Sequence, residues 1–141
     1  MPQSTFVVAY DGHDQNVLDA AIRLAKMQSA GIHVVHVIEW SPFKMLTPEE
    51  LADRHKQRQA EIAHADQNVL RPALAKIIAL GIAADGEIRH GDVKDTISEV
   101  ATAKSADLIF VGRSRSLSDR VFGSVASGLA QTSTLPVVII P

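Results

Sequence analysis

Short β-branched, apolar runs alternate along the chain with longer segments of helical periodicity, and this alternation limits the fold more than any other feature. The extended runs are residues 5–10, 32–40, 85–91, 106–112 and 136–140. Such alternation is typical of a parallel sheet whose helical crossovers cover both faces. The sequence therefore predicts an α/β fold, an open five-stranded parallel sheet of the Rossmann-like type. No internal repeat or change of composition divides residues 1–141, which are predicted to form a single domain.

The apolar content of the five runs predicts their order in the sheet. Residues 5–10 and 107–111 are the most apolar and are expected at the centre, whereas the polar run 85–91 is expected at an edge. A spatial order of 3-2-1-4-5 satisfies both conditions and places the chain reversal between the first and fourth strands. Ligands of open α/β sheets bind beyond the carboxyl ends of the strands at such a reversal. The loops "YDGHD" and "GRSRS" are therefore predicted to form the ligand crevice.

Capping residues predict where the first two helices begin and end. Asp14 is a suitable N-cap, and Gly31 is expected to stop the helix that follows it. Thr47, followed by proline and then by Glu50 three residues on, has the pattern of a capping box. Pro72 lies inside the same helical pattern and cannot donate a backbone hydrogen bond. We therefore expect a kink or a break there.

The stretch "VGRSRSLSDRVFGS" has the composition of an anion-binding loop. Gly112 ends a strand, and Gly123 lies at or just inside the start of the last helix, where unpaired backbone N–H groups suit a phosphate. Side-chain donors to such a phosphate are also present, namely Arg113, Ser114, Arg115, Arg120 and Ser124. From these residues alone, an ordinary solvated turn, with Gly123 placed for helix–sheet packing, is an equally good interpretation.

Other candidate residues have a structural alternative of the same kind. Asp11 can accept a hydrogen bond from an adenine amino group or a ribose hydroxyl, or it can cap the next helix. The spacings of His33 with His36, and of His55 with His64, place each pair on opposite faces, so no metal site is predicted. His36 is instead expected to be a hydrogen-bonded core residue. The sequence has no P-loop lysine motif and no G-x-S-x-G nucleophile elbow.

Composition excludes several classes of protein. An apolar fraction of 46% and a net charge of −2 exclude a disordered chain and do not favour a nucleic-acid binder, which needs an excess of positive charge. The absence of cysteine excludes disulfide scaffolds, thiol catalysis and cysteine-based zinc sites. No run is long and apolar enough for a membrane span, and no secretory signal precedes the first strand. We therefore expect a cytoplasmic protein without membrane or nucleic-acid partners.

The chain resembles the universal stress protein family over essentially its whole length. The resemblance rests on "VVAYDGH", "AAIRLA", "HVVHVIE", "IRHGDVKDTISEVATAKSADLIFVG" and "GSVASGLAQTSTLPVVIIP". It implies a crevice between the first and fourth strands that holds an adenine nucleotide (ATP, ADP or AMP), with Mg²⁺ as a candidate phosphate counter-ion. The residues that would bind this nucleotide by resemblance are Ala9, Tyr10, Asp11, Val37, Gly112, Gly123, Ser124 and Val125, and the loop residues Arg113, Ser114 and Arg115 complete the predicted site as side-chain donors.

The arginine-rich loop departs from the pattern of the nucleotide-binding members, which is G-x-x-G, nine residues and then Gly-Ser or Gly-Thr. Arg115 stands where the second glycine belongs, and seven residues separate it from Gly123. An arginine disfavours the positive φ that a glycine accepts. Two hypotheses follow: a stress-response regulatory protein that binds an adenine nucleotide and acts on an unidentified partner, or a homodimeric interaction or adaptor protein with a vestigial site.

The resemblance also bears on assembly and catalysis. It implies that the last strands of two copies pair across a two-fold axis, so a homodimer through Val137–Ile140 is expected under either hypothesis. An apolar strand at a sheet edge is open to such pairing. No enzymatic turnover is expected, because Asp11 would lie at the base end of the nucleotide and Asp119 is the one acid expected near its phosphates. Slow nucleotide hydrolysis stays open as an alternative.

Overall fold

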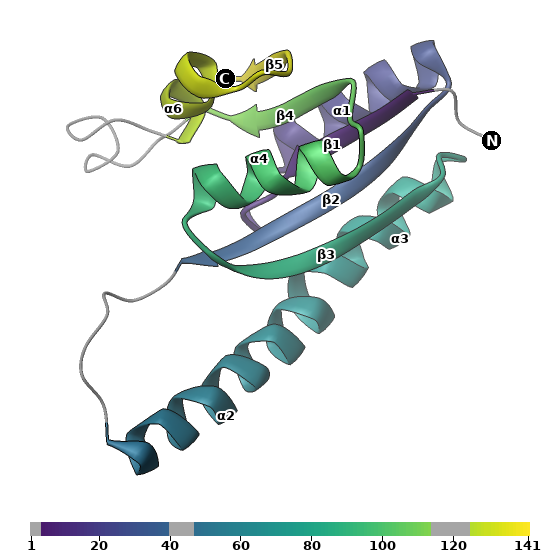
Figure 1. Cartoon of the computed structure of the whole chain (residues 1–141). Helices are drawn as coiled ribbons and strands as arrows, with labels where there is room; N and C mark the ends of the chain where they lie inside the picture. Colours follow the sequence, from purple (N-terminus) through teal and green to yellow (C-terminus); the bar gives the residue numbers. More distant parts are fainter. Residues whose placement is uncertain (1–3, 40–46, 114–124) are drawn as a thin grey trace.

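A computed structural model of the chain describes residues 4–39, 47–113 and 125–141. Its strands form one parallel sheet in the order β3-β2-β1-β4-β5, which confirms the predicted fold class and strand order (Figure 1). The strands are β1 (Ser4–Ala9), β2 (Ala30–Glu39), β3 (Ala84–Gly91), β4 (Leu108–Gly112) and β5 (Val137–Ile140). The most apolar strands, β1 and β4, are neighbours near the centre of the sheet, where the middle residues of both strands are buried.

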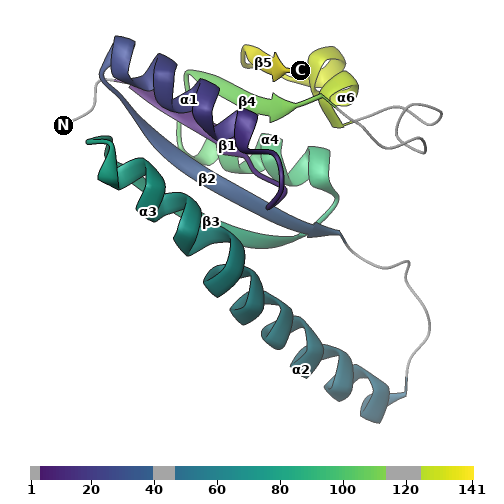
Figure 2. The same cartoon turned by 180° about the vertical axis from the view of Figure 1, so that it is seen from behind.

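Helices cover both faces of the sheet, and each pair encloses its own apolar core. The helical segments are α1 (Gln15–Gln28), α2 (Pro48–Ala65), the π-helical turn η1 (Asp66–Leu70), α3 (Arg71–Ala79), α4 (Val93–Ala103) and α6 (Val125–Thr132). Helices α1 and α3 lie on the face turned toward the reader in Figure 2, and α4 and α6 cover the other face (Figures 1 and 2). Phe6 and Phe110 fill the α1–α3 side, with ring centroids 5.2 Å apart.

The predicted start of α1 is confirmed, but its predicted end is wrong. The side chain of Asp14 accepts a hydrogen bond from the backbone N–H of Asn16, as an N-cap does. The helix ends at Ser29, which takes a left-handed conformation with φ of 55° and donates its backbone N–H to Ala25. Gly31, which was expected to end the helix, already lies inside β2. Serine thus supplies the left-handed residue that a glycine usually provides.

The predicted beginning and interruption of the second helical segment are both confirmed. Thr47 accepts a hydrogen bond from the backbone N–H of Glu50, and α2 starts at the proline between them. Five residues of π-helix precede Arg71, and Pro72 lies in the first turn of α3. Proline cannot donate to the carbonyl four residues earlier, so a wider turn at this point accommodates the missing hydrogen bond. Helix α2 projects away from the sheet, and Ala65 is its one buried residue (Figure 2).

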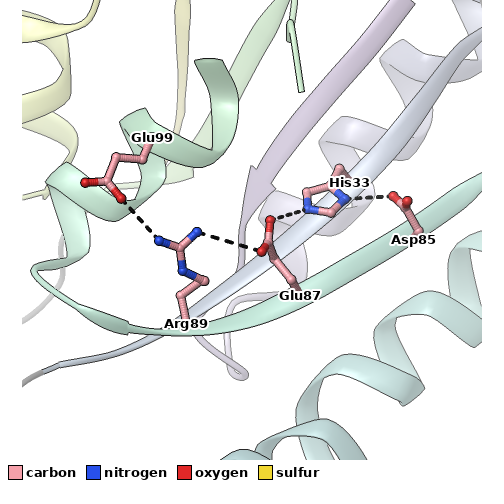
Figure 3. Close-up of polar contacts among 5 residues, drawn as sticks. All are labelled: His33, Asp85, Glu87, Arg89 and Glu99. Atoms are coloured by element: carbon pink, nitrogen blue, oxygen red, sulfur yellow. Dashed lines mark hydrogen bonds and ion pairs between the residues drawn. The ribbon is translucent and has the colours of Figure 1, made fainter. Parts of the chain in front are cut away.

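The buried histidine of β2 is His33 rather than His36. His33 is 3% exposed, and its ring lies between two carboxylates of β3, with Nδ1 2.7 Å from Asp85 and Nε2 2.9 Å from Glu87 (Figure 3). Arg89 continues this row of charges along the strand and pairs with Glu99 of α4 at 3.2 Å (Figure 3). Charged groups of this kind protect a sheet edge from pairing with another chain.

Candidate functional site

A cavity of about 470 Å³ lies beyond the carboxyl ends of β1, β2 and β4. Its volume is in the range of small-molecule sites. The described residues of the predicted site all line it, namely Ala9, Tyr10, Asp11, Val37, Gly112, Arg113 and Val125. The other predicted residues, Ser114, Arg115, Gly123 and Ser124, lie outside the described part of the chain. The parallel sheet therefore brings the loop after β1 and the first residues of the second loop, Gly112 and Arg113, to one place, because β1 and β4 end at the same edge.

The side of the cavity next to α4 is apolar. Val35 and Val37 are two residues apart on β2, so their side chains point to the same face of the sheet. Val93 and Ile97 lie on successive turns of α4. Together with Val125 from α6 they form an apolar wall, which we call the apolar slot, and Glu39 stands at its end because it follows Val37 by two residues on the same face of β2. A slot of this kind suits a flat, weakly polar group, such as a nucleobase.

A turn after β1 forms the opposite wall. One oxygen of Asp11 accepts hydrogen bonds from the backbone N–H groups of His13, at 2.7 Å, and Asp14, at 2.9 Å. Gly12, which lies between Asp11 and His13, has a φ of 95°, and a Cβ at this residue would lie 3.2 Å from Val69. Glycine meets both demands, since it has no side chain and accepts positive φ. Asp11 therefore closes a turn that precedes α1, whose N-cap is Asp14, so the helix cap that was its structural alternative is supplied by another residue; Asp11 also lines the cavity.

Two contacts tie the end of β1 to β2 at the floor of the cavity. The backbone N–H of Tyr10 donates to Val35 at 3.0 Å, and Nδ1 of His36 lies 2.8 Å from the carbonyl oxygen of Tyr10. The Tyr10 hydroxyl accepts a hydrogen bond from the side chain of Gln15. Burial raises the pKa of Tyr10 above its usual value, and the negative charge of Asp11 raises it further. His36 is thus hydrogen-bonded, as predicted, but it is half-buried in the cavity wall rather than in the core.

The exit of β4 is closed on one side by the first turn of α1. A Cβ at Gly112 would lie 2.6 Å from Oδ2 of Asp14 and 3.1 Å from Cγ2 of Val17. No larger residue fits there unless the Asp14 side chain moves, so glycine permits this close approach. The carboxylate of Asp14 consequently lies directly against the point where the chain leaves the sheet.

Several residues of the cavity wall were not predicted from the sequence. The polar ones are His13, Asp14, His36 and Glu39, and the apolar ones are Val17, Val35, Val93, Ile97 and Val111. The place of His13 and Asp14 in the sequence could have indicated them, because both follow β1 within the predicted crevice loop. The apolar residues carry no such signal, since the same side chains also belong to, or pack against, the two cores.

Comparison with known proteins gives one consistent result. The family model described as universal stress protein family matches residues 4–141. The chain is 32% identical to universal stress protein YxiE of Bacillus subtilis, over 95% of this chain and 96% of the relative. A universal stress protein solved in complex with cAMP is 25% identical, with a TM-score of 0.71 over 98% of this chain and 97% of the other. Universal stress protein UspA from Lactobacillus plantarum shares the fold, with a TM-score of 0.83, 23% identity and coverage of 100% and 99%.

Among the described residues, no helix combines the length and apolar character needed to cross a membrane.

Proposed function

The chain belongs to the universal stress protein family, and from that premise we propose that it is a stress-response regulatory protein that binds an adenine nucleotide. The observation that supports this most is that the seven expected nucleotide residues within the described part of the chain line one cavity at the carboxyl edge of β1, β2 and β4. The cavity has an apolar slot beside a polar turn, which is the combination that a base joined to a sugar phosphate requires. The structural relative that holds cAMP supports the same ligand class.

In this proposal the base lies in the apolar slot, packed on Val37, with Ala9, Tyr10 and Asp11 along its edge. The ribose and phosphates lie toward Gly112, and the side chain of Arg113 supplies a charge-assisted contact. Val125 stands at the start of α6, where backbone N–H groups suit a phosphate. The proposal extends to Ser114, Arg115, Gly123 and Ser124, which lie outside the described residues.

We propose a binding role without turnover and a homodimer that pairs through β5. Asp11 supports the first point, because the backbone of the β1 turn already engages its carboxylate. Mg²⁺ is proposed as a counter-ion for longer phosphates, since it is usually held by one or two carboxylates together with phosphate oxygens. Asp14 offers such a carboxylate at the exit of β4. A cytoplasmic location is proposed from the absence of cysteine, which suits a reducing compartment.

The experiment that tests nucleotide binding is thermal denaturation with and without millimolar adenosine, AMP, ADP, ATP or cAMP, with GMP for comparison. A ligand that binds the folded state raises the melting temperature by mass action. We expect a rise for at least one adenine compound. Val37→Phe fills the slot and should abolish the rise, whereas Ile38→Phe changes the next residue of β2, which does not line this cavity, and should keep it.

Two results would decide against the proposal. If no adenine compound raises the melting temperature and mass spectrometry finds none released from freshly purified protein, the nucleotide-binding function is wrong. The homodimeric interaction protein with a vestigial site is then the better description. Release of phosphate from ATP by the wild-type protein, and not by Val37→Phe, would contradict the absence of turnover.

A further inference from the structure

We infer that Asp14 selects against ligands with long phosphate chains, so that without divalent cations the cavity takes adenosine or AMP in preference to ATP. This inference rests on the proposed function, since it assumes that the phosphates of the ligand lie toward the exit of β4. It concerns a residue outside the predicted set of binding residues. The class of ligand that it assigns to the cavity is an adenine compound of low phosphate charge.

The position of Asp14 is fixed from two sides. One carboxylate oxygen caps α1 by accepting from the backbone N–H of Asn16 at 3.1 Å. The other lies 2.6 Å from the Cβ position of Gly112, so it faces the point where β4 ends. The side chain cannot swing away from β4 without giving up the cap, and loss of a cap destabilises a helix. The negative charge is therefore held beside the place where the proposed ligand carries its phosphates.

The rest of the described wall carries more negative than positive side chains. Asp11 and Glu39 also line the cavity, so carboxylates outnumber the one arginine, Arg113, among the described lining residues. The side chain of Arg113 is exposed, and its backbone N–H donates to Ile140 of β5 at 2.7 Å. Like charges a few ångströms apart at a partly buried site repel more strongly than they do in water. Asp14 should thus weaken binding more with each further phosphate group than an uncharged residue would at this position.

Repulsion by one fixed carboxylate predicts a graded effect. Adenosine carries no phosphate charge, AMP carries about two negative charges at neutral pH and ATP about four. Removal of the Asp14 charge should therefore leave adenosine binding unchanged, strengthen AMP binding moderately and strengthen ATP binding most. A role of Asp14 that is limited to capping α1 would instead change all three affinities in the same proportion.

The variant Asp14→Asn tests this directly, because asparagine caps helices as well as aspartate does and has the same shape. Asp92→Asn is the matched control: Asp92 is the N-cap of α4 and does not line this cavity. Dissociation constants for adenosine, AMP and ATP are measured by calorimetry in EDTA, so that no divalent cation bridges carboxylate and phosphate. We expect Asp14→Asn to strengthen ATP binding by about tenfold or more and to change adenosine binding by less than about twofold. The control should change all three by less than about twofold.

The outcomes separate this inference from the proposed function. If AMP binds the wild-type protein but Asp14→Asn strengthens the binding of ATP no more than the binding of adenosine, the inference alone is wrong. If none of the three ligands binds either protein, the proposed function fails and the inference with it. The wild-type protein gives a second measurement that needs no variant: salt screens repulsion, so its ATP affinity should rise with ionic strength. A fall with ionic strength would show that positive charge dominates the site and would overturn the inference.

Discussion

Nδ1 of His36 lies 2.8 Å from the carbonyl oxygen of Tyr10, and this contact joins the second strand to the loop that leaves the first. A carbonyl oxygen only accepts hydrogen bonds, so Nδ1 is the donor. The ring of His36 also forms part of the cavity wall. The turn that contains Asp11 is therefore held against β2 by a residue that lines the proposed ligand site.

Replacing His36 by leucine should lower the free energy of unfolding by about 1–2 kcal/mol, because the Tyr10 carbonyl loses its donor. His36→Asn is the matched variant, since the asparagine amide can place an N–H near the position of Nδ1. Urea denaturation of both variants measures the difference, and the asparagine variant should lose clearly less stability. Equal losses for the two variants would mean that the hydrogen bond is not the source of the effect.

The single tyrosine of the chain, Tyr10, should titrate above the usual pKa of 10.0 in the folded protein. Burial disfavours the phenolate, and the nearby charge of Asp11 acts in the same direction. The folded state therefore binds this proton more tightly than the unfolded state. The stability it contributes is complete below pH 10.0 and is lost as the pH rises through the folded-state pKa.

Phenolate absorbance reports this titration without interference from other tyrosines. The midpoint in native protein should lie at higher pH than the midpoint in concentrated urea. Tyr10→Phe should reduce the loss of stability at alkaline pH, because the variant has no phenol to ionise. A native midpoint at or below the midpoint in urea would contradict the buried position of the ring.

His33 should be coupled more strongly to Glu87 than to Asp85, although the Asp85 contact is the shorter of the two. The Asp85 side chain is 71% exposed and that of Glu87 is 34% exposed, so water screens the first pair more effectively. Double-mutant cycles that combine His33→Leu with Glu87→Gln or with Asp85→Asn measure the two couplings from the free energies of unfolding. A larger coupling to Asp85 would show that contact distance, rather than exposure, decides the strength of the pair.

The sequence predicts the sheet well because its order follows from a property of whole strands. Strands that are buried on both faces, such as β1 and β4, are apolar along most of their length, and this pattern does not depend on individual side-chain contacts. Contacts between distant segments carry no such pattern. A Cβ at Gly86 would lie 2.6 Å from Leu70 and 2.7 Å from the carbonyl of Val34, which shows how tightly η1 packs on β3. Nothing near either residue in the sequence indicates this contact.

The same difference separates the predicted and missed parts of the site. Residues directly after β1 and β4 were predicted because parallel strands end at a common edge. The approach of Asp14 to Gly112 depends instead on the direction in which α1 leaves its turn, and this direction is set by the hydrogen bonds of Asp11 and the positive φ of Gly12. The periodicity of strands and helices does not predict the direction in which a helix leaves a turn, nor which side chains it brings together.

The edge of β5 offers a specific test of the proposed homodimer. The carbonyl oxygens of Pro136 and Ile140 accept hydrogen bonds from Ile109 and Arg113, so these two residues face β4. Because backbone groups alternate in direction along a strand, the N–H and C=O of Ile139 face the free edge. Ile139 is also 41% exposed. Pairing with a second copy through this edge would use the Ile139 backbone N–H.

Ile139→Pro should therefore convert a dimer into a folded monomer, since proline removes the outward donor and leaves the hydrogen bonds to β4 in place. Ile139→Val retains the backbone N–H and a β-branched side chain, and should stay dimeric. Light scattering at micromolar concentration measures the mass of each protein, and circular dichroism checks that the sheet is retained. A wild-type monomer would contradict the homodimer itself. A dimeric Ile139→Pro variant would contradict the use of the Ile139 N–H in the dimer.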